Sequence, residues 1–285
     1  MKALRTVVSG KNREVTISRD GPTVVIGGRI NPTGRKDLTQ ALHSGDMQFL
    51  IDEAVKQVKA GADVIDINVG AAGINEDEVL PNAVAAITSV IDTPISIDSN
   101  SPSALEAALE ACPGKPIINS VNGKEEGLSN ILPLVASKKA AVIGLTLDEN
   151  GIPNEPEKRF AIAEKIVNQA VKAGIAHEDV IIDPLALTIG TDQRSALITL
   201  ETIRLIVERL GLNINLGISN ISFGLPGRDV INKSFLSIAL AFGATCLIVD
   251  PAKAKEEILA LDLLLNKDKY CKRYLSFQKN KRLKV

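Results

Sequence analysis

The stretch GADVIDINVG, residues 61–70, contains the pattern that decides the fold: a short apolar strand that runs directly into polar residues. Between such stretches the chain carries apolar residues at helical spacing, as in ALEAALEAC at 104–112 and RFAIAEKIVNQAVKAG at 159–174. The strand pattern occurs eight times, in TVVIG from residue 23, DVIDI from 63, PISID from 94, PIINS from 116, AAVIGL from 140, DVIID from 179, NINLGI from 213 and TCLIV from 245. The chain therefore alternates predicted strands and helices over most of its length.

The predicted strands are almost continuously apolar, which is typical of parallel strands that helices cover on both faces. Eight strand–helix units in about 250 residues match the size of a closed (β/α)₈ barrel. An open, doubly wound sheet is the alternative, because periodicity alone does not distinguish it from a barrel. The first strand lacks the glycine-rich dinucleotide turn of many such sheets. We therefore predict a single (β/α)₈ TIM barrel of the α/β class over residues 23–267.

Two segments lie outside the repeat. Residues 1–22 contain TVVSG and EVTIS on either side of Lys11 and Asn12, which predicts a hairpin that closes the bottom of the barrel. Residues 268–285 are strongly basic and predict a helix with a frayed end, which we interpret as a solvated tail rather than a functional element.

The composition narrows the class of protein. The chain has 33 Lys and Arg against 34 Asp and Glu, so no basic excess attracts nucleic acid or anionic lipid. Neither a signal peptide nor a membrane span is indicated, because no long uncharged apolar run occurs. Three distant cysteines give neither a disulfide framework nor a zinc site. We expect a cytoplasmic protein that binds neither nucleic acid nor membranes.

Polar residues gather where the predicted strands end, which is where a barrel places its chemistry. Most of them are amides or carboxylates. They are Arg29 and Asn31 after the first strand, Asp66 and Asn68 after the second, Asp98 and Asn100 after the third, Asn119 after the fourth, Asp183 after the sixth, and Ser219 and Asn220 after the seventh.

Each of these residues taken singly could be a helix cap, and Asp98 and Asn100 before SPSALEAAL fit that role. As a set they would point from several strands into one mouth, where buried polar groups need partners. Carboxylate and amide oxygens accept from N–H donors, and amide nitrogens donate to a carbonyl or ring nitrogen. A pterin edge offers both kinds of group. Phosphate fits less well, because the acidic side chains would repel it and no Walker loop is present.

Histidine chemistry is not indicated. His43 and His177 lie in polar contexts between expected elements, and neither is at a strand end. A catalytic triad, a histidine acid or base and a His/Cys metal cluster are therefore disfavoured, and we predict no metal bound by this chain. No histidine stands in the DxHxxG arrangement of corrinoid-carrying domains, so any cobalt would arrive on another protein.

The chain resembles the methyltetrahydrofolate:corrinoid protein methyltransferases and the folate domain of cobalamin-dependent methionine synthase, within the pterin-binding barrel superfamily. The resemblance runs from about residue 23 to 271 at the strand ends. It rests on VVIGGRINPTG at 24–34, GADVIDINVG at 61–70, PISIDSNSPSALEAAL at 94–109, KPIINSVNG at 115–123, AVIGLTLDENGIP at 141–153, VIIDPL at 180–185 and LGISNISFGLPGRDVINKSFL at 216–236.

The resemblance implies roles for individual residues. Asp98, Asn119 and Asp183 would bind the pterin edge, with Asp66 and Asn68 lining the same floor. Asn220 would approach N-5, the nitrogen that carries the methyl group, and is the expected catalytic residue. Arg228 would shape the mouth and bind folate or corrinoid carboxylates. Arg29, Asn31, Ser219 and Phe223 are further residues expected at the mouth.

The implied reaction exchanges a methyl group between N-5 of tetrahydrofolate and the cobalt, or cobalamin, of a separate corrinoid protein. It would serve one-carbon metabolism, either in acetogenesis or in demethylation of a methylated amine or betaine. Its direction stays open, and the resemblance implies a homodimer. A dihydropteroate synthase-like enzyme and a non-catalytic folate-binding protein are the alternatives.

Two positions depart from the family pattern. Gly28 stands where many relatives have Glu, and Phe223 stands where the acetogenic branch commonly has a polar residue. The SNISF form is closer to that of methionine synthase, so the polar network around N-5 would be smaller.

Overall fold

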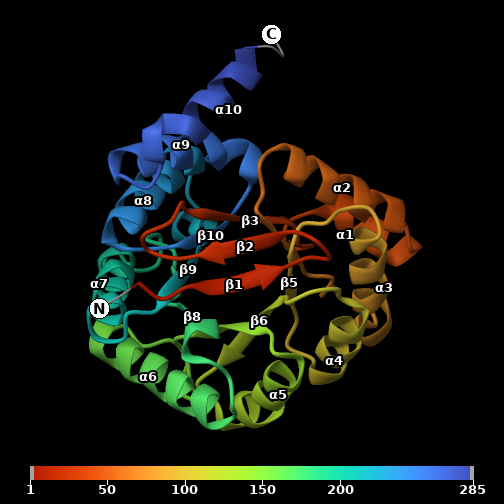
Figure 1. Ribbon diagram of the computed structural model, residues 1–285. Coiled ribbons are helices and arrows are strands. Elements are labelled where there is room, and N and C mark those ends of the chain that lie inside the picture. Colours follow the sequence, from red (N-terminus) through yellow and green to blue (C-terminus); the bar gives the residue numbers. More distant parts are fainter. Residues whose placement is uncertain (1–2, 283–285) are drawn as a thin grey trace.

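The computed structural model describes residues 3–282 and contains a barrel of parallel strands inside a ring of helices (Figure 1). The barrel strands are β3 (Val24–Ile30), β4 (Val64–Ile67), β5 (Ile95–Asp98), β6 (Ile117–Asn122), β7 (Ala141–Leu145), β8 (Val180–Asp183), β9 (Asn213–Gly217) and β10 (Cys246–Val249). Strand β10 pairs with both β9 and β3, so the sheet closes on itself. The predicted closed barrel is confirmed, and the open-sheet alternative is wrong.

The helices follow the strands in the predicted alternation. They are α1 (Lys36–Ser44), α2 (Met47–Lys59), α3 (Glu76–Thr88), α4 (Pro102–Ala111), α5 (Glu125–Lys138), α6 (Pro156–Lys172), α7 (Ser195–Arg209), α8 (Arg228–Phe242), α9 (Pro251–Leu264) and α10 (Lys272–Arg282), with short 3₁₀ helices η1 (His177–Asp179), η2 (Ile218–Ser222) and η3 (Lys269–Cys271). The first crossover holds two helices, because Gly45 at φ 69° ends α1 and Asp46 then caps α2. His43, expected between elements, lies within α1.

The core has two layers. The larger one lies between the barrel strands and the helices, and the smaller one fills the barrel itself. The inner layer includes Val24, Ile26, Ile143 and Ile181, all fully or almost fully buried. It fills only the lower part of the barrel, because at the upper ends of several strands the inward positions are polar.

A hairpin closes the lower end of the barrel, as predicted. It consists of β1 (Thr6–Ser9) and β2 (Glu14–Ile17) and lies across the barrel in Figure 1. Val8 and Ile17 of the hairpin are fully buried in the inner layer. From inside the barrel, Asn213 Nδ2 donates to Thr6 Oγ1 at 3.0 Å and to the Ile17 carbonyl at 2.9 Å. These bonds satisfy a buried amide and hold the hairpin in place.

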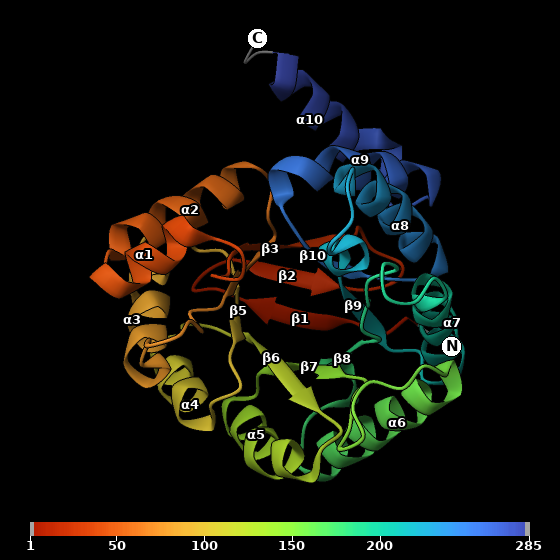
Figure 2. The same cartoon turned by 180° about the vertical axis from the view of Figure 1, so that it is seen from behind.

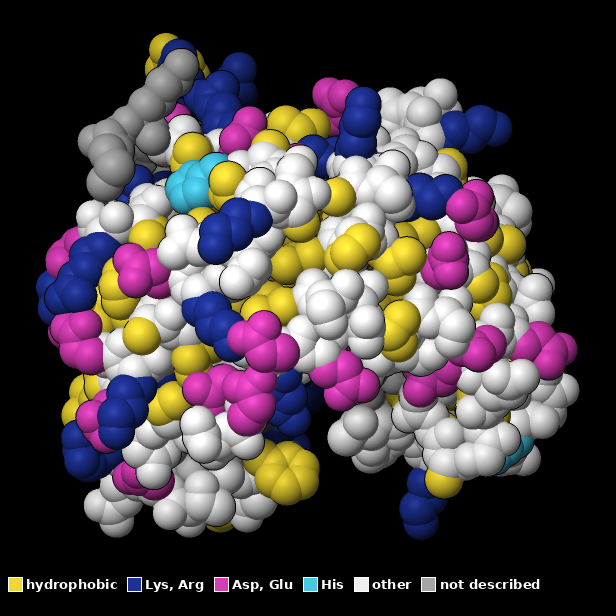
Figure 3. Space-filling view, turned by 90° about the horizontal axis from the view of Figure 1, so that it is seen from below, with side chains coloured by type: hydrophobic (Ala, Val, Ile, Leu, Met, Phe, Trp, Pro, Cys, Tyr) yellow, Lys and Arg dark blue, Asp and Glu magenta, His cyan; other side chains and the backbone are white. Residues whose placement is uncertain are grey.

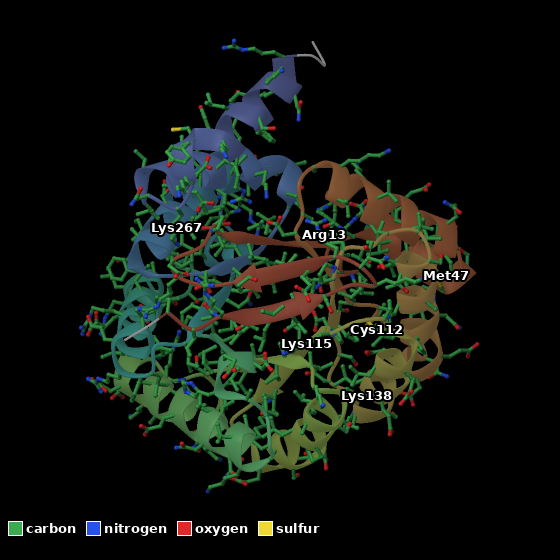
Figure 4. The ribbon with its side chains drawn as sticks, in the orientation of Figure 1. Arg13, Met47, Cys112, Lys115, Lys138 and Lys267 are labelled. Atoms are coloured by element: carbon green, nitrogen blue, oxygen red, sulfur yellow. The ribbon has the colours of Figure 1, made fainter. Side chains whose placement is uncertain are left out.

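The hairpin also bonds to the chain that leads into β6. The backbones of Ser9 and Lys115 exchange hydrogen bonds of 2.9 and 3.0 Å, and Figure 4 labels Lys115 at this end of the barrel. Gly114 allows this approach, since a side-chain carbon there would lie 2.2 Å from the Gly10 carbonyl oxygen. Within residues 3–282 the hairpin thus closes the lower end through contacts with the starts of the strands, which leaves the opposite end for a ligand.

The C-terminal segment is helical, as predicted. Helix α10 projects from the ring of helices in Figure 1, and residues 283–285 of the predicted segment lie outside the described residues. Buried Asp262 ties this segment to the barrel, since it accepts from Thr23 of the barrel and from Arg273 at 3.0 Å. No helix within residues 3–282 has the length and apolar character needed to cross a membrane.

Candidate active site at the carboxyl end of the barrel

The open end of the barrel carries the carboxyl ends of the strands, and Figure 2 views the molecule from that side. Figure 3 shows a hollow between two lobes at the lower edge of the molecule. A polar cavity of about 350 Å³ lies on one side of the mouth. It is lined by Thr33, Asn68, Gly70, Ala71, Ala72, Glu76, Asp98, Ser99 and Asn100.

Asp66 lies on the floor of the mouth and is 2 % exposed. It accepts hydrogen bonds from Ser96 Oγ at 2.6 Å and from Asn119 Nδ2 at 3.1 Å. The register explains the contact with Ser96, because Asp66 and Ser96 are paired residues on β4 and β5. Burial raises the pKa of Asp66 above its ordinary value, and the two hydrogen bonds act against this.

Asp98 lies one level higher, at the end of β5 and beside Asn119 in the strand register. Burial is the main cause that raises its pKa, to about 8, and the charges of Asp66 and Glu76 raise it further. The neighbouring amide of Asn68 acts in the opposite direction. Burial and like charge therefore favour the proton-carrying form of the Asp98 carboxyl, whereas carboxyl groups in water are ionised at neutral pH.

Asp183 forms a second polar group on the other side of the floor. Its carboxylate accepts from the Leu185 backbone N–H at 2.8 Å and from Asn215 Nδ2 at 2.7 Å. Burial raises its pKa to about 6, and the hydrogen bonds together with the charge of Arg159 limit this rise. The Asn215 side chain is completely buried, and its Oδ1 atom has no hydrogen-bond partner within the described chain.

Arg159 supports the loop that follows Asp183. Its guanidinium is buried and donates to the carbonyls of Pro153, Pro184 and Leu185, each at 2.7 Å. Leu185 has a left-handed backbone with φ 61°, a conformation that costs a non-glycine residue energy. The bonds from Arg159 hold this turn in the shape that directs the Asp183 carboxylate into the mouth.

Asn220 lies above the floor, in η2, where it is exposed. A side-chain carbon built on Gly217 would come within 3.1 Å of Asn220 Nδ2. The Asn220 amide therefore occupies the space that a side chain at the top of β9 would fill. Within residues 3–282 its side chain makes no hydrogen bond, which leaves both its donor and its acceptor available to a ligand.

Arg228 fixes the loop that carries Asn220. It donates from Nε to Ser222 Oγ at 3.0 Å and from Nη2 to the Ser219 carbonyl at 2.7 Å. Its guanidinium also lies 5.8 Å from the centre of the Phe223 ring, and that ring is 65 % exposed. The predicted mouth residues Ser219, Phe223 and Arg228 therefore lie together at the rim, with Ser219 contributing its backbone.

The first-strand residues are less central. Arg29 faces Glu53 at 3.9 Å and Asp250 at 3.8 Å, and Asn31 accepts from the Thr33 backbone N–H within its own turn. Gly28 has a structural explanation, since a side-chain carbon there would lie 2.6 Å from Ile248 Cγ2. Ile248 therefore occupies the space that a larger side chain at position 28 would need.

The helix-cap alternative for the third strand end is wrong. Ser101 caps α4, accepting from the Ala104 N–H at 3.3 Å, and neither Asp98 nor Asn100 does so. Sequence analysis also missed Ser96, Asn215, Arg159 and Glu76. For Ser96 and Asn215 a signal was present, because each is a polar residue at an inward position of an otherwise apolar strand.

Comparison with known proteins agrees with this geometry. Residues 27–250 match the family described as "Pterin binding enzyme". The chain is 32% identical over 261 residues to a methylcorrinoid:tetrahydrofolate methyltransferase of Eubacterium limosum, covering 88% of this chain and 94% of that protein. It is also 32% identical to methionine synthase of Mycobacterium tuberculosis, over 91% of this chain but only 24% of that longer protein.

Solved structures share the fold. Dihydropteroate synthase from Xanthomonas albilineans in complex with 7,8-dihydropteroate superimposes with a TM-score of 0.71 at 19% identity, covering 91% of this chain and 98% of that one. The enzyme from Vibrio fischeri ES114 gives a TM-score of 0.70 at 20% identity, covering 92% of this chain and 99% of that one. The family match spans most of the barrel, including every strand-end carboxylate described above, and the chain belongs to the pterin-binding enzyme family.

Proposed function

We propose that this protein is a methyltransferase that exchanges a methyl group between N-5 of tetrahydrofolate and the cobalt of a separate corrinoid protein. The name of the Eubacterium limosum relative supports this, because the two chains match over nearly their whole lengths. The methionine synthase relative supports only the folate-binding part of this proposal, since this chain spans about a quarter of that longer protein.

The arrangement of the floor and the rim carries the proposal. The buried side chains of Asp66, Asn119 and Asp183 on the floor, with the Asp98 carboxyl one level above them, offer acceptors and donors for a flat heterocycle. At the end of β9 the amide of Asn220 has no hydrogen-bond partner within the described residues, which supports a role in binding the ring nitrogen that carries the methyl group. A ligand with a polar edge at one end and a reactive nitrogen at the other fits this arrangement.

The chemistry explains why an amide and a protonated acid are useful together. When the methyl group leaves N-5, the electrons of the carbon–nitrogen bond stay on nitrogen, which must gain a hydrogen bond or a proton. The cobalt of the partner supplies the nucleophile in that direction and the methyl group in the other. We propose that Asn220 bonds to N-5 and that Asp98 exchanges the proton, directly or through water.

Substitution of Asn220 tests the catalytic assignment. We expect Asn220→Ala to slow single-turnover methyl transfer by at least about tenfold, or about 1.4 kcal/mol, because a hydrogen bond that strengthens in the transition state is lost. Rapid-mixing measurements with saturating folate separate this step from binding. Asn75→Ala removes an exposed amide whose side chain does not cap α3 and should leave the rate unchanged. A loss smaller than tenfold for Asn220→Ala would contradict the assignment. Folate binding without any turnover would favour the non-catalytic alternative.

The protonation of Asp98 predicts a pH dependence. With its pKa raised to about 8, the carboxyl is protonated below that pH and ionised above it. In the folate-demethylating direction the rate should therefore stay level up to about pH 7, reach about half of its maximum near pH 8 and fall further as the acid is lost. Asp98→Asn cannot ionise, so its lower rate should show no fall between pH 7 and 9. A fall that persists in this variant would assign the ionisation to another group.

Two further expectations belong to this proposal. We propose that the protein acts as a homodimer in the cytoplasm, as the sequence resemblance implies. Light scattering at micromolar concentration should give about twice the chain mass of 30.3 kDa. A single-chain mass at that concentration would refute the dimer without affecting the methyl-transfer assignment.

A further inference from the structure

Glu76 is a carboxylate of the mouth with no role in the site as described so far. It opens α3, where an acidic residue would ordinarily be explained by the helix dipole alone. Its side chain lines the polar cavity, and its Oε2 atom accepts from Ser99 Oγ at 2.6 Å. This bond crosses from the loop after β4 to the loop after β5, next to Asp98.

The second oxygen of Glu76 faces the site. A side-chain carbon built on Gly70 would lie 3.2 Å from Glu76 Oε1 and 3.3 Å from Asn68 Oδ1, so both oxygens are directed at the same small space. Glycine at position 70 keeps this space open. Within the described residues Oε1 has no hydrogen-bond partner, so the carboxylate keeps one oxygen free beside the residues that surround Asp98.

The charged groups that act on Asp98 are both acids. Asp66 faces it from β4 and Glu76 from α3, while the side chains of Asn68 and Asn119 near it are neutral. A like charge nearby disfavours ionisation, and burial increases the effect by removing solvent screening. Glu76 is the less buried of the two acids, so it can be changed with less disturbance to the floor.

Building on the methyl-transfer function proposed above, we infer that Glu76 is a positioning residue for Asp98. Through Ser99 it fixes the backbone that carries Asp98, and its charge adds to the burial and to the Asp66 charge that favour the proton-carrying form of the Asp98 carboxyl. As the methyl group leaves N-5, the O–H bond of Asp98 breaks, its proton joins N-5, and Asp98 becomes a carboxylate. In the reverse direction that carboxylate takes the proton from N-5.

Glu76→Gln tests this inference, because glutamine still accepts the Ser99 hydrogen bond but carries no charge. We expect the alkaline fall in the single-turnover rate to begin about one pH unit lower than in the unmodified protein. At pH 6, where Asp98 is protonated in both proteins, the two rates should agree within about twofold. Glu78→Gln is the matched control, because it removes an exposed charge in the same helix turn and should leave the profile in place.

Ser99→Ala separates the two parts of the role. It removes the tether and keeps the charge of Glu76, so it should lower the rate at every pH without moving the alkaline fall. Thermal melting of each variant checks that the fold is intact. An unchanged profile for folded Glu76→Gln, or an equal shift for Glu78→Gln, would overturn the inference while the methyl-transfer function stands.

A second measurement tests the role of Glu76 without requiring methyl transfer. Calorimetry of 5-methyltetrahydrofolate binding at pH 8, in buffers of different ionisation enthalpy, gives the number of protons exchanged. Because Asp98 titrates near this pH, Glu76→Gln should change that number and Glu78→Gln should not. If the unmodified protein binds folate but transfers no methyl group, the proposed function fails, and this proton count still decides whether Glu76 controls Asp98.

Discussion

Asp183→Asn should weaken the binding of 5-methyltetrahydrofolate about 100-fold, or by about 2.7 kcal/mol. Both oxygens of Asp183 already accept bonds, from the Leu185 N–H and from Asn215 Nδ2. An amide at this position carries no charge, and its NH₂ group must face one of these donors. Two donors cannot bond to each other, so one hydrogen bond of the network is lost. The pterin edge would then lose an acceptor that the buried floor cannot replace with water.

Isothermal titration at pH 7.5 measures this affinity directly. Asp192→Asn is the matched control, since this half-buried aspartate lies on the same loop and, within residues 3–282, its carboxylate accepts only from the Arg194 N–H. The control should bind within about twofold of the unmodified protein. If Asp183→Asn binds folate within threefold, the pterin edge does not contact this carboxylate and the proposed orientation of the ligand is wrong.

Arg159→Met should lower the free energy of unfolding by about 4 kcal/mol. The side chain is 1 % exposed, and its removal leaves the Pro153, Pro184 and Leu185 carbonyls without the donor they share. Methionine fills much of the volume, so the loss reflects hydrogen bonding more than an empty cavity. The turn at Leu185 would also lose the bonds that hold its left-handed backbone.

Urea unfolding followed by circular dichroism measures the change, and the melting temperature should fall by about 10 °C. Lys158→Met on the preceding residue removes a positive charge that is largely exposed and, among the described residues, pairs only with Glu155, so its effect should stay below about 0.5 kcal/mol. A loss below about 1 kcal/mol for Arg159→Met would mean that the three carbonyls find other partners. The variant should also bind folate less tightly, because the Asp183 turn is no longer held.

The alternation of strands and helices could be predicted because the residue pattern of each segment indicates its structure without reference to the rest of the chain. Each barrel strand is a short run of apolar residues, and such a run is recognisable without knowing its neighbours. The hairpin was predictable for the same reason, since two alternating segments flank a turn. The division of the first crossover into two helices, α1 and α2, was not predicted. The glycine that separates them, Gly45, is a weak signal within a polar stretch.

For the site, the sequence predicted only which strand ends carry polar residues. Asp66, Asp98, Asn119 and Asp183 were recognised because they follow apolar runs directly. Their hydrogen-bond partners were not, since Ser96 and Asn215 lie inside strands that look apolar as a whole. Arg159 could not be found from its sequence context, because a helical arginine is ordinarily exposed, and only the approach of the Asp183 loop buries it.

The sequence by itself determined the barrel, its closing hairpin and the strand ends where chemistry would occur, because apolar periodicity and its interruptions are local properties of the chain. Tertiary structure alone decided the protonation of Asp98, the placement of the Asn220 amide over Gly217 and the contact between Glu76 and Ser99. The first and third features depend on burial and on contacts between residues of different elements, and the second depends on the path of the chain after β9. These arise only when the barrel closes.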